Sequence, residues 1–411
     1  MRRTSALVLL LLLLPAPRAG ASSEEFSTFD VVRAEDDDES VIDHVLTRAP
    51  IEWRDEWEHA PQAFRLSQGC LTSANWFIET QLKTSSPLGR RARFELRLDQ
   101  SESDRASWND LELWGRFPQP IGSLGVMFRP YADKSRHDMA LTWGTGADSS
   151  AFQLEAAWGF EDLFNNLWAF RQTQVGGVSE PYLRHPWEPA LKLAARHPRW
   201  RVELAGKYLT PSEKRLAPLV PGDPPTLATL WGTHANAAVE VLVGRATLEA
   251  RSENWQATSA RAFERSFSTF PTRDVERMWS VESAVRAPLA PTLAGELRWT
   301  YLERSATRGV LDDPDRFGAV DRVLQAETRW ALRPSLTLRA GGLYDRITLG
   351  WSGPVWIQTF GTRNESRAYF GLDARWGRVR LSAVEGIELD PEPYQVNFHH
   401  DKAFAQVQTT F

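Results

Sequence analysis

The stretch "DKAFAQVQTTF" (residues 401–411) ends on a two-residue period. Counting back, one set is Phe411, Thr409, Val407, Ala405 and Ala403, and the other is Thr410, Gln408, Gln406 and Lys402. Phe404 is the one apolar residue in the polar set. Alternation of this kind predicts a β-strand with two unlike faces. Chain ends usually fray, so we expect another strand to pair with this one.

The same period recurs along the chain from residue 76 onward. Examples are "RARFELRLDQ" (91–100), "RWRVELAGKY" (199–208) and "RVLQAETRW" (322–330), each with one apolar and one charged face. Such strands fit a soluble sandwich, whose apolar faces pack together. They also fit a membrane barrel, whose apolar face meets lipid and whose polar face lines a lumen. Periodicity alone does not separate these two architectures.

Strand length and connection length favour the barrel. The segments are about ten residues long, which matches the ~9–11 residues that a tilted membrane strand needs. Tight turns at 118–120, 197–198, Gly244, 333–334 and Gly377 alternate with long polar connections at 161–187, 210–233, 257–276, 306–320 and 350–365. Bacterial barrels have short periplasmic turns and long outer loops. Connection 161–187 also has apolar residues at helical spacing, so it is either a rim loop or a short helix folded inward.

Aromatic placement is a third feature that favours the barrel. If the tight turns are periplasmic, aromatic residues fall on the apolar face at both strand ends, as the two interfacial girdles of a barrel do. The periplasmic set is Trp143, Trp200, Trp330, Trp376 and Phe411. The outer set is Phe160, Tyr208, Trp279, Tyr301, Tyr344 and Phe370.

The fold class predicted is an all-β, antiparallel transmembrane barrel of 18 strands, with 16 as the alternative, because bacterial barrels have even strand numbers. The predicted strands are 60–68, 76–84, 91–99, 107–117, 121–130, 136–145, 151–160, 188–196, 199–209, 234–243, 245–256, 277–287, 292–305, 321–332, 335–349, 366–376, 378–388 and 402–411. Residues 392–399 are read as part of an outer loop, since a strand there would break the up-and-down order.

The N-terminal residues read as a secretory signal peptide. Arg2 and Arg3 precede a short apolar run, and the small residues "AGA" (19–21) follow it. We therefore expect a signal peptide at 1–21, an acidic and flexible periplasmic segment at 22–59, and the barrel at 60–411. The single Cys70 excludes an internal disulfide.

The last ten or so residues, with alternation and a terminal Phe411, resemble the C-terminal signature of Gram-negative outer-membrane β-barrel proteins. The resemblance implies an outer-membrane location, contact with outer-membrane lipid, and recognition of the last strand by the barrel-assembly machinery. It does not indicate a narrower family.

The polar faces give a set of candidate lumen-lining residues: Arg93, Arg97, Asp110, Glu112, Trp114, Arg116, Glu155, Arg201, Glu203, Glu296, Arg298, Glu327, Arg329, Asp373, Arg375 and Phe404. The charged members fit cross-strand pairs that solvate the wall, or residues that tune selectivity. Because neither sign dominates, we predict weak ion selectivity. The aromatic members, Trp114 and Phe404, fit either wall packing or a stacking track for sugar rings.

These features predict an outer-membrane channel for hydrophilic solutes. One alternative is a barrel for saccharide or polysaccharide export or uptake that works with periplasmic partners; another is a surface enzyme or a structural barrel. The sequence has no GxSxG, HExxH or Cys/His metal spacing, so we expect no enzyme, cofactor or metal. The net charge of −5 is concentrated before the barrel, and no basic footprint for nucleic acid is present.

Overall fold

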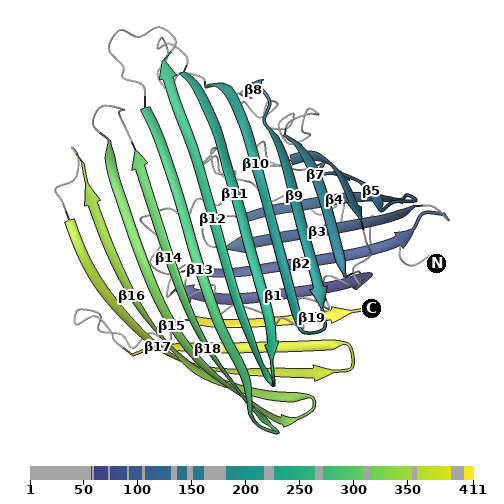
Figure 1. Cartoon of the computed structure of the whole chain (residues 1–411), viewed down its shortest axis with the longest axis vertical. Helices are drawn as coiled ribbons and strands as arrows, with labels where there is room; N and C mark the ends of the chain where they lie inside the picture. Colours follow the sequence, from purple (N-terminus) through teal and green to yellow (C-terminus); the bar gives the residue numbers. More distant parts are fainter. Residues whose placement is uncertain are drawn as a thin grey trace.

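The computed structural model describes residues 57, 60–72, 75–89, 92–103, 107–130, 137–145, 151–161, 182–216, 226–263, 272–308, 314–353, 359–389 and 402–411. The strands are β1 (Gln62–Thr72), β2 (Asn75–Pro87), β3 (Arg93–Ser103), β4 (Ser107–Pro118), β5 (Ser123–Phe128), β6 (His137–Thr145), β7 (Phe152–Glu161), β8 (Tyr182–Arg184), β9 (Trp187–His197), β10 (Trp200–Leu216), β11 (Thr226–Val243), β12 (Ala246–Phe263), β13 (Thr272–Ala290), β14 (Leu293–Arg308), β15 (Asp315–Arg333), β16 (Leu336–Ser352), β17 (Thr359–Trp376), β18 (Val379–Glu388) and β19 (Lys402–Thr410). They form one antiparallel sheet (Figure 1).

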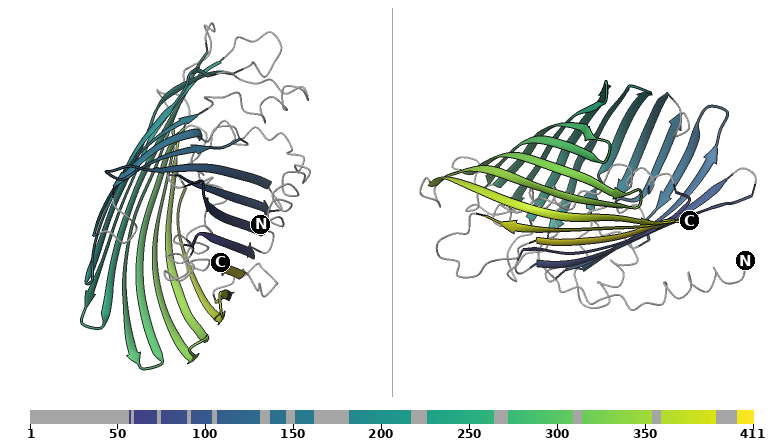
Figure 2. Two further views of the ribbon diagram at one scale, coloured as in Figure 1. Left: turned by 90° about the vertical axis from the view of Figure 1, so that its right-hand side faces the viewer. Right: turned by 90° about the horizontal axis from the view of Figure 1, so that it is seen from below.

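The sheet closes on itself through its first and last strands. β1 pairs with β2 on one side and with β19 on the other, where Phe64 faces Thr409. On the inner face of this seam, Arg65 donates hydrogen bonds to Gln81 of β2 at 3.1 Å and to Gln408 of β19 at 3.2 Å. The view from below in Figure 2 shows the resulting ring of strands. The expectation that another strand pairs with the C-terminal stretch is therefore confirmed, and its partners are β18 and the first strand, β1.

Two of the strand segments form a single strand of the barrel wall. β8 and β9 both pair with β10, and the fully buried Pro186 lies between them. Proline has no N–H to give to a ladder, so a strand is readily interrupted there. Counting β8 and β9 as one wall strand gives a closed barrel of 18 strands, which confirms the predicted fold class.

The two ends of the barrel differ in their connections. At one end, here called the turn end, two-residue turns join β11 to β12 and β17 to β18, and Gly244 and Gly377 adopt φ of 63° and 59°. Glycine takes such left-handed angles without strain, and tight hairpins require them. The opposite end, here called the loop end, carries the longer connections between β10 and β11, β12 and β13, and β18 and β19.

The strands from β10 to β17 are longer than the sequence indicated. Most of the predicted loops 210–233, 257–276, 306–320 and 350–365 are strand, and β13 and β15 each have 19 residues. Figure 1 shows these strands as a tall wall, while β3–β7 are shorter. Beyond the ~9–11 residues that cross a bilayer, both faces of a strand can meet water, so apolar alternation no longer marks it.

Several predicted features lie outside the described residues: the signal peptide, the acidic segment apart from residue 57, the part of connection 161–187 for which a rim loop or an inward helix is predicted (162–181), and the outer loop at 392–399. Among the described residues, no helix has the length and apolar character needed to cross a membrane.

The inner and outer faces of the barrel have the opposite polarity to a soluble protein. Along β15, Val323, Gln325 and Glu327 are buried, whereas Leu324 and Trp330 on the other face are 47% and 51% exposed. Large apolar side chains would not stay exposed to water on this scale. The outer face is therefore a lipid-facing surface, which excludes the sandwich alternative.

Candidate functional site: the charged inner wall

The structure puts the predicted lumen-lining residues on one face of the sheet, opposite the exposed apolar residues. This inner face carries Arg93, Arg97, Glu112, Trp114, Arg116, Glu155, Arg201, Glu203, Glu296, Arg298, Glu327, Arg329, Asp373, Arg375 and Phe404. Asp110 lies in β4, across from Asp99 of β3. Only some of these residues contact one another, and the contacts form separate clusters.

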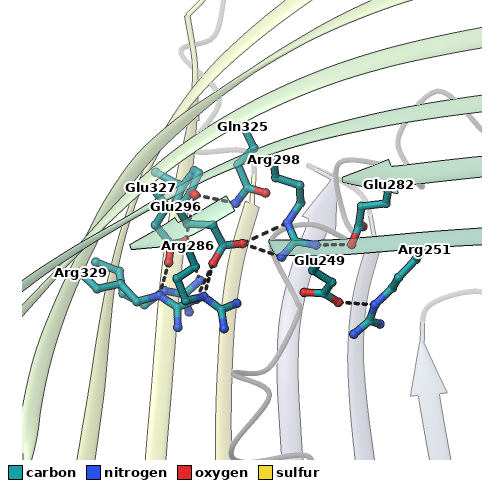
Figure 3. Close-up of polar contacts among 11 residues, drawn as sticks. Glu249, Arg251, Glu282, Arg286, Glu296, Arg298, Gln325, Glu327 and Arg329 are labelled. Atoms are coloured by element: carbon teal, nitrogen blue, oxygen red, sulfur yellow. Dashed lines mark hydrogen bonds and ion pairs between the residues drawn. The ribbon is translucent and has the colours of Figure 1, made fainter. Parts of the chain in front are cut away.

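The largest cluster crosses β12–β17 (Figure 3). At its centre, Glu296 of β14 and Glu327 of β15 are directly opposite each other. Two carboxylates in this position repel each other unless cations compensate them. Arg298 Nη2 donates to Glu296 Oε1 at 2.5 Å, and Arg286 Nε donates to Glu296 Oε2 at 2.9 Å. Arg298 also bonds Glu282 of β13, which extends the cluster to the neighbouring strand.

Glu327 accepts hydrogen bonds from three different side chains. Arg329 Nε lies 2.5 Å from Oε1, Arg339 Nη2 lies 3.0 Å from Oε2, and the Tyr369 hydroxyl donates to Oε2 at 2.9 Å. Gln325 Nε2 in turn donates to the Tyr369 hydroxyl at 2.7 Å. A buried carboxylate is costly unless cations and hydrogen-bond donors compensate its charge, as these groups do. Glu327, 2% exposed at its side chain, is therefore a buried carboxylate whose charge is compensated by three donors.

A glycine allows the tyrosine to reach this carboxylate. Glu327, Gly341 and Tyr369 occupy one cross-strand row, with Gly341 of β16 in the middle. A Cβ at Gly341 would lie 2.4 Å from the Tyr369 hydroxyl and 2.6 Å from the carbonyl oxygen of Ala326. Because glycine has no Cβ, the tyrosine ring crosses β16 and bonds a carboxylate on β15.

A second ionic cluster lies on β3 and β4. Arg97 Nε contacts Glu95 Oε1 at 2.5 Å, and Arg116 Nε lies 3.9 Å from Glu95 Oε2. Both guanidinium groups also lie over the Trp114 ring, at 5.8 and 5.3 Å from its centroid. Glu112 accepts a hydrogen bond from Trp114 Nε1 at 2.8 Å and pairs with Arg129.

The inner-wall aromatics are occupied by neighbouring side chains. Phe404 of β19 stacks on Phe77 of β2 with ring centroids 6.3 Å apart, at the level of Gly69 of β1, the strand that lies between them. Trp114 is flanked by the two arginines named above. These contacts favour the wall-packing interpretation over a free stacking track for sugar rings.

Within many inner-wall pairs, the cation is more exposed than the carboxylate. Lys192 is 49% exposed and its partner Glu203 is 24% exposed. Arg251 is 34% exposed and Glu249 only 8%. The pairs of Arg97, Arg116, Arg201 and Lys207 follow the same order. The carboxylates lie near the wall and the cations extend from it, although the exposed Glu155 and Glu253 reduce this bias.

A third cluster, toward the loop end, carries an excess of buried acid. Asp345 of β16 is directly opposite Glu365 of β17, and Asp321 lies on the next strand, β15. All three are at most 3% exposed. Arg304 donates to Asp321 at 2.9 Å, and Arg367 lies 3.6 Å from Glu365, whereas no described cation forms an ion pair with Asp345. No group of three acidic, His or Cys residues in the described part of the chain could hold a metal ion.

This arrangement predicts that Asp345→Asn stabilises the barrel. The substitution removes a like charge opposite Glu365, and such a charge costs about 0.2–1 kcal/mol. We expect a higher urea midpoint for the refolded protein in detergent micelles, read by tryptophan fluorescence. Asp321→Asn is the matched control, because it weakens the pair with Arg304 and should lower the midpoint. A urea midpoint that is lower than the native one for both variants would contradict the prediction.

The predicted girdle residues lie on the outer face. Those of the turn end are Trp143, Trp200, Trp330, Trp376 and Phe411, and those of the loop end are Phe160, Tyr208, Trp279, Tyr301, Tyr344 and Phe370. Trp279 and Tyr301 meet edge to face at 5.4 Å. On β10, the distance from Trp200 to Tyr208 matches the ~9 residues of a membrane-crossing strand.

The roles of Gly341 and Gln325, and the cluster around Asp345, were not foreseen from the sequence. The pair Gly341–Gly342 inside a strand pattern was an available signal, since glycine there often marks a close approach of another group. The contact between Glu327 and Tyr369 depends on the pairing register of three strands, and periodicity does not supply it.

Comparisons with known proteins give structural neighbours only. No family model matches the chain, and no curated protein matches its sequence. A loop-deletion mutant of OmpT, an outer membrane protein of Vibrio cholerae, is 9% identical with a TM-score of 0.40, over 85% of this chain and 97% of that one. A bacterial polysaccharide outer membrane secretin is 12% identical with a TM-score of 0.40, over 86% and 99%. The Pseudomonas putida toluene transporter TodX is 9% identical with a TM-score of 0.30, over 86% and 91%.

These neighbours are all outer-membrane proteins, but similarity at this level transfers no function. The closed sheet, the lipid-facing apolar surface and the ionic inner wall define the class independently. The chain is an outer-membrane-type β-barrel of 18 strands.

Proposed function

We propose that the protein is an outer-membrane channel for hydrophilic solutes, with no enzymatic activity of its own. The observation that carries the proposal is the ionic inner wall of a closed 18-strand barrel. Barrels of 16–18 strands are wide enough for an aqueous channel. A wall with cations that remain one-third to one-half exposed, such as Arg97 and Lys192, is suited to contact with water.

The exposed cations further support a preference for anions, in place of the weak selectivity expected from the sequence alone. Permeating ions meet the exposed ends of side chains more closely than buried carboxylates. Lys192, Arg201 and Lys207 are the exposed members on β9 and β10. We therefore assign small anionic or neutral hydrophilic solutes as the favoured permeants.

We expect stepwise, stable conductance from the refolded protein in a planar bilayer, with a reversal potential in a KCl gradient that indicates chloride preference. Lys192→Gln/Arg201→Gln should lower the chloride-to-potassium permeability ratio. Arg322→Gln, which removes an exposed cation from the outer face, should leave the ratio unchanged. A silent bilayer would contradict the channel, and a conducting, cation-preferring pore would contradict only the assigned selectivity.

A further inference from the structure

A basic pocket lies on the outer face, just beyond the loop-end aromatic girdle. It has a volume of about 320 Å³ and is lined by Arg273, Val275, Arg277, Ser305, Thr307 and Pro314. Arg277 faces Ser305 and Val275 faces Thr307 across β13 and β14. Arg277 is two residues beyond Trp279 of the girdle, so it lies on the same outer face of β13.

The pocket brings together the groups that recognise a phosphate. Two guanidinium groups give paired donors that match phosphate oxygens, and the hydroxyl groups of Ser305 and Thr307 can also donate. Arg273 lies over the Trp231 ring at 5.8 Å, a cation–π contact that holds its side chain at the pocket. No ion pair joins Arg273 or Arg277 to a carboxylate of the described residues, whereas inner-wall arginines such as Arg298 and Arg339 have such partners.

The basic surface continues across the next strands at the same height. Arg322 of β15 and Arg346 of β16 are directly opposite each other, and both are exposed on the outer face. Arg322 also lies 6.0 Å from the Tyr301 ring of the girdle. Like charges in directly opposite positions are unfavourable, so an anion beside them would stabilise this part of the sheet. Glu303 is the acidic residue of the same surface, and it accepts a hydrogen bond from Tyr301.

The position of the pocket relative to the membrane indicates which phosphate-bearing molecule can occupy it. Aromatic girdles lie at the boundary between hydrocarbon and headgroups, and bacterial barrels have their long loops outside the cell. A group in this pocket is therefore at the headgroup level of the outer leaflet. Interfacial arginines attract anionic headgroups. Acyl chains attached to such a headgroup would run down over Trp279 and Tyr301, which a free anion would not contact.

We propose that Arg273 and Arg277, with Ser305 and Thr307, bind the phosphate of a phosphorylated lipid of the outer leaflet, and that Arg322 and Arg346 extend this site. The site is independent of whether the barrel conducts. It assigns the outer wall of β13–β16 as a specific lipid-binding surface, beyond general contact with the bilayer.

The test uses the full-length refolded protein in detergent, with bisphosphorylated lipid A as the probe and native mass spectrometry to count bound lipid. We expect Arg273→Gln/Arg277→Gln to weaken lipid A binding at least tenfold. The control, Arg245→Gln/Arg378→Gln, removes the same charge from exposed turn-end positions and should leave binding unchanged. Heat-modifiable migration on a gel verifies that each variant is folded.

Two further experiments test whether the protein recognises the phosphate group, and whether that phosphate belongs to a lipid or to a free anion. Dephosphorylated lipid A should bind as weakly to the native protein as lipid A binds to the pocket variant. Millimolar inorganic phosphate should not displace lipid A. An equal loss of lipid A binding in the pocket and control variants would overturn the site in favour of general charge attraction. Displacement by inorganic phosphate would overturn the lipid assignment in favour of a free-anion site.

Discussion

Replacing Glu327 with alanine is expected to lower the free energy of unfolding by about 3–5 kcal/mol, the usual cost of removing one partner from a buried ionic pair. The substitution leaves Arg339, 4% exposed, without its closest carboxylate. It also removes the acceptor of the Tyr369 hydroxyl and of Arg329 Nε. The unfolding midpoint in urea, followed by tryptophan fluorescence in detergent micelles, measures the effect.

Two further variants make this prediction specific. Glu155→Ala removes an exposed carboxylate from the inner face of β7, so it should change stability by no more than about 0.5 kcal/mol. Glu327→Gln keeps an oxygen acceptor for Tyr369 but loses the charge. Its unfolding midpoint should therefore fall between those of the two alanine variants. Similar midpoints for Glu327→Ala and Glu155→Ala would show that the cluster around Glu327 contributes nothing to stability.

Replacing Gly341 with alanine is expected to lower the free energy of unfolding by a comparable amount, because the added methyl group occupies the space of the tyrosine. The new Cβ would lie 2.4 Å from both Cζ and the hydroxyl of Tyr369. Overpacking typically costs 1–3 kcal/mol, and a displaced Tyr369 also loses its charged acceptor, worth about 1.5–3 kcal/mol. We expect a total loss of about 2.5–6 kcal/mol, measured as above.

The matched control is Gly318→Ala on the neighbouring strand, where a Cβ would meet no atom within 4 Å. That variant should be neutral or slightly stabilising, since alanine restricts the unfolded chain. A double-mutant cycle with Tyr369→Leu then tests the cause. If the clash is with the tyrosine, the leucine substitution should cost less in the Gly341→Ala background than in the native protein. Strictly additive losses would place the strain at the Ala326 carbonyl instead.

The sequence predicted most of the fold because lipid and lumen impose opposite polarities on adjacent residues. Glu327 and Arg329 were assigned to the inner face, and Leu324 and Trp330 to the outer face, from the two-residue period alone. The predicted strands are too short where the chain leaves the membrane, because lipid no longer imposes an apolar face there. The segment around Arg273 and Glu276 extends beyond the membrane region, and its strand character comes from backbone pairing with β12 and β14.

Site geometry was less predictable than face assignment. Alternation identifies which residues share the inner face, but ion pairs form between particular residues on different strands. Tyr369 reaches Glu327 across 42 positions of sequence, and only the register of β15, β16 and β17 brings them together. The position of cations relative to carboxylates also depends on side-chain packing. A balanced count of charges therefore predicts weak selectivity, whereas the greater exposure of the cations within many inner-wall pairs supports the proposed preference for anions.

The pairing of β1 with β19 has a consequence for the order of assembly. Apart from that seam, each wall strand pairs with its neighbours along the chain, so hairpins can form one after another. Arg65 and Gln408, which meet at the seam, are 343 positions apart. Until Phe64 and Thr409 are aligned, two strand edges carry backbone groups without partners, and lipid cannot satisfy them. Closure of the seam is thus the least local step of folding, and an incomplete barrel must be shielded from the bilayer until its two ends meet.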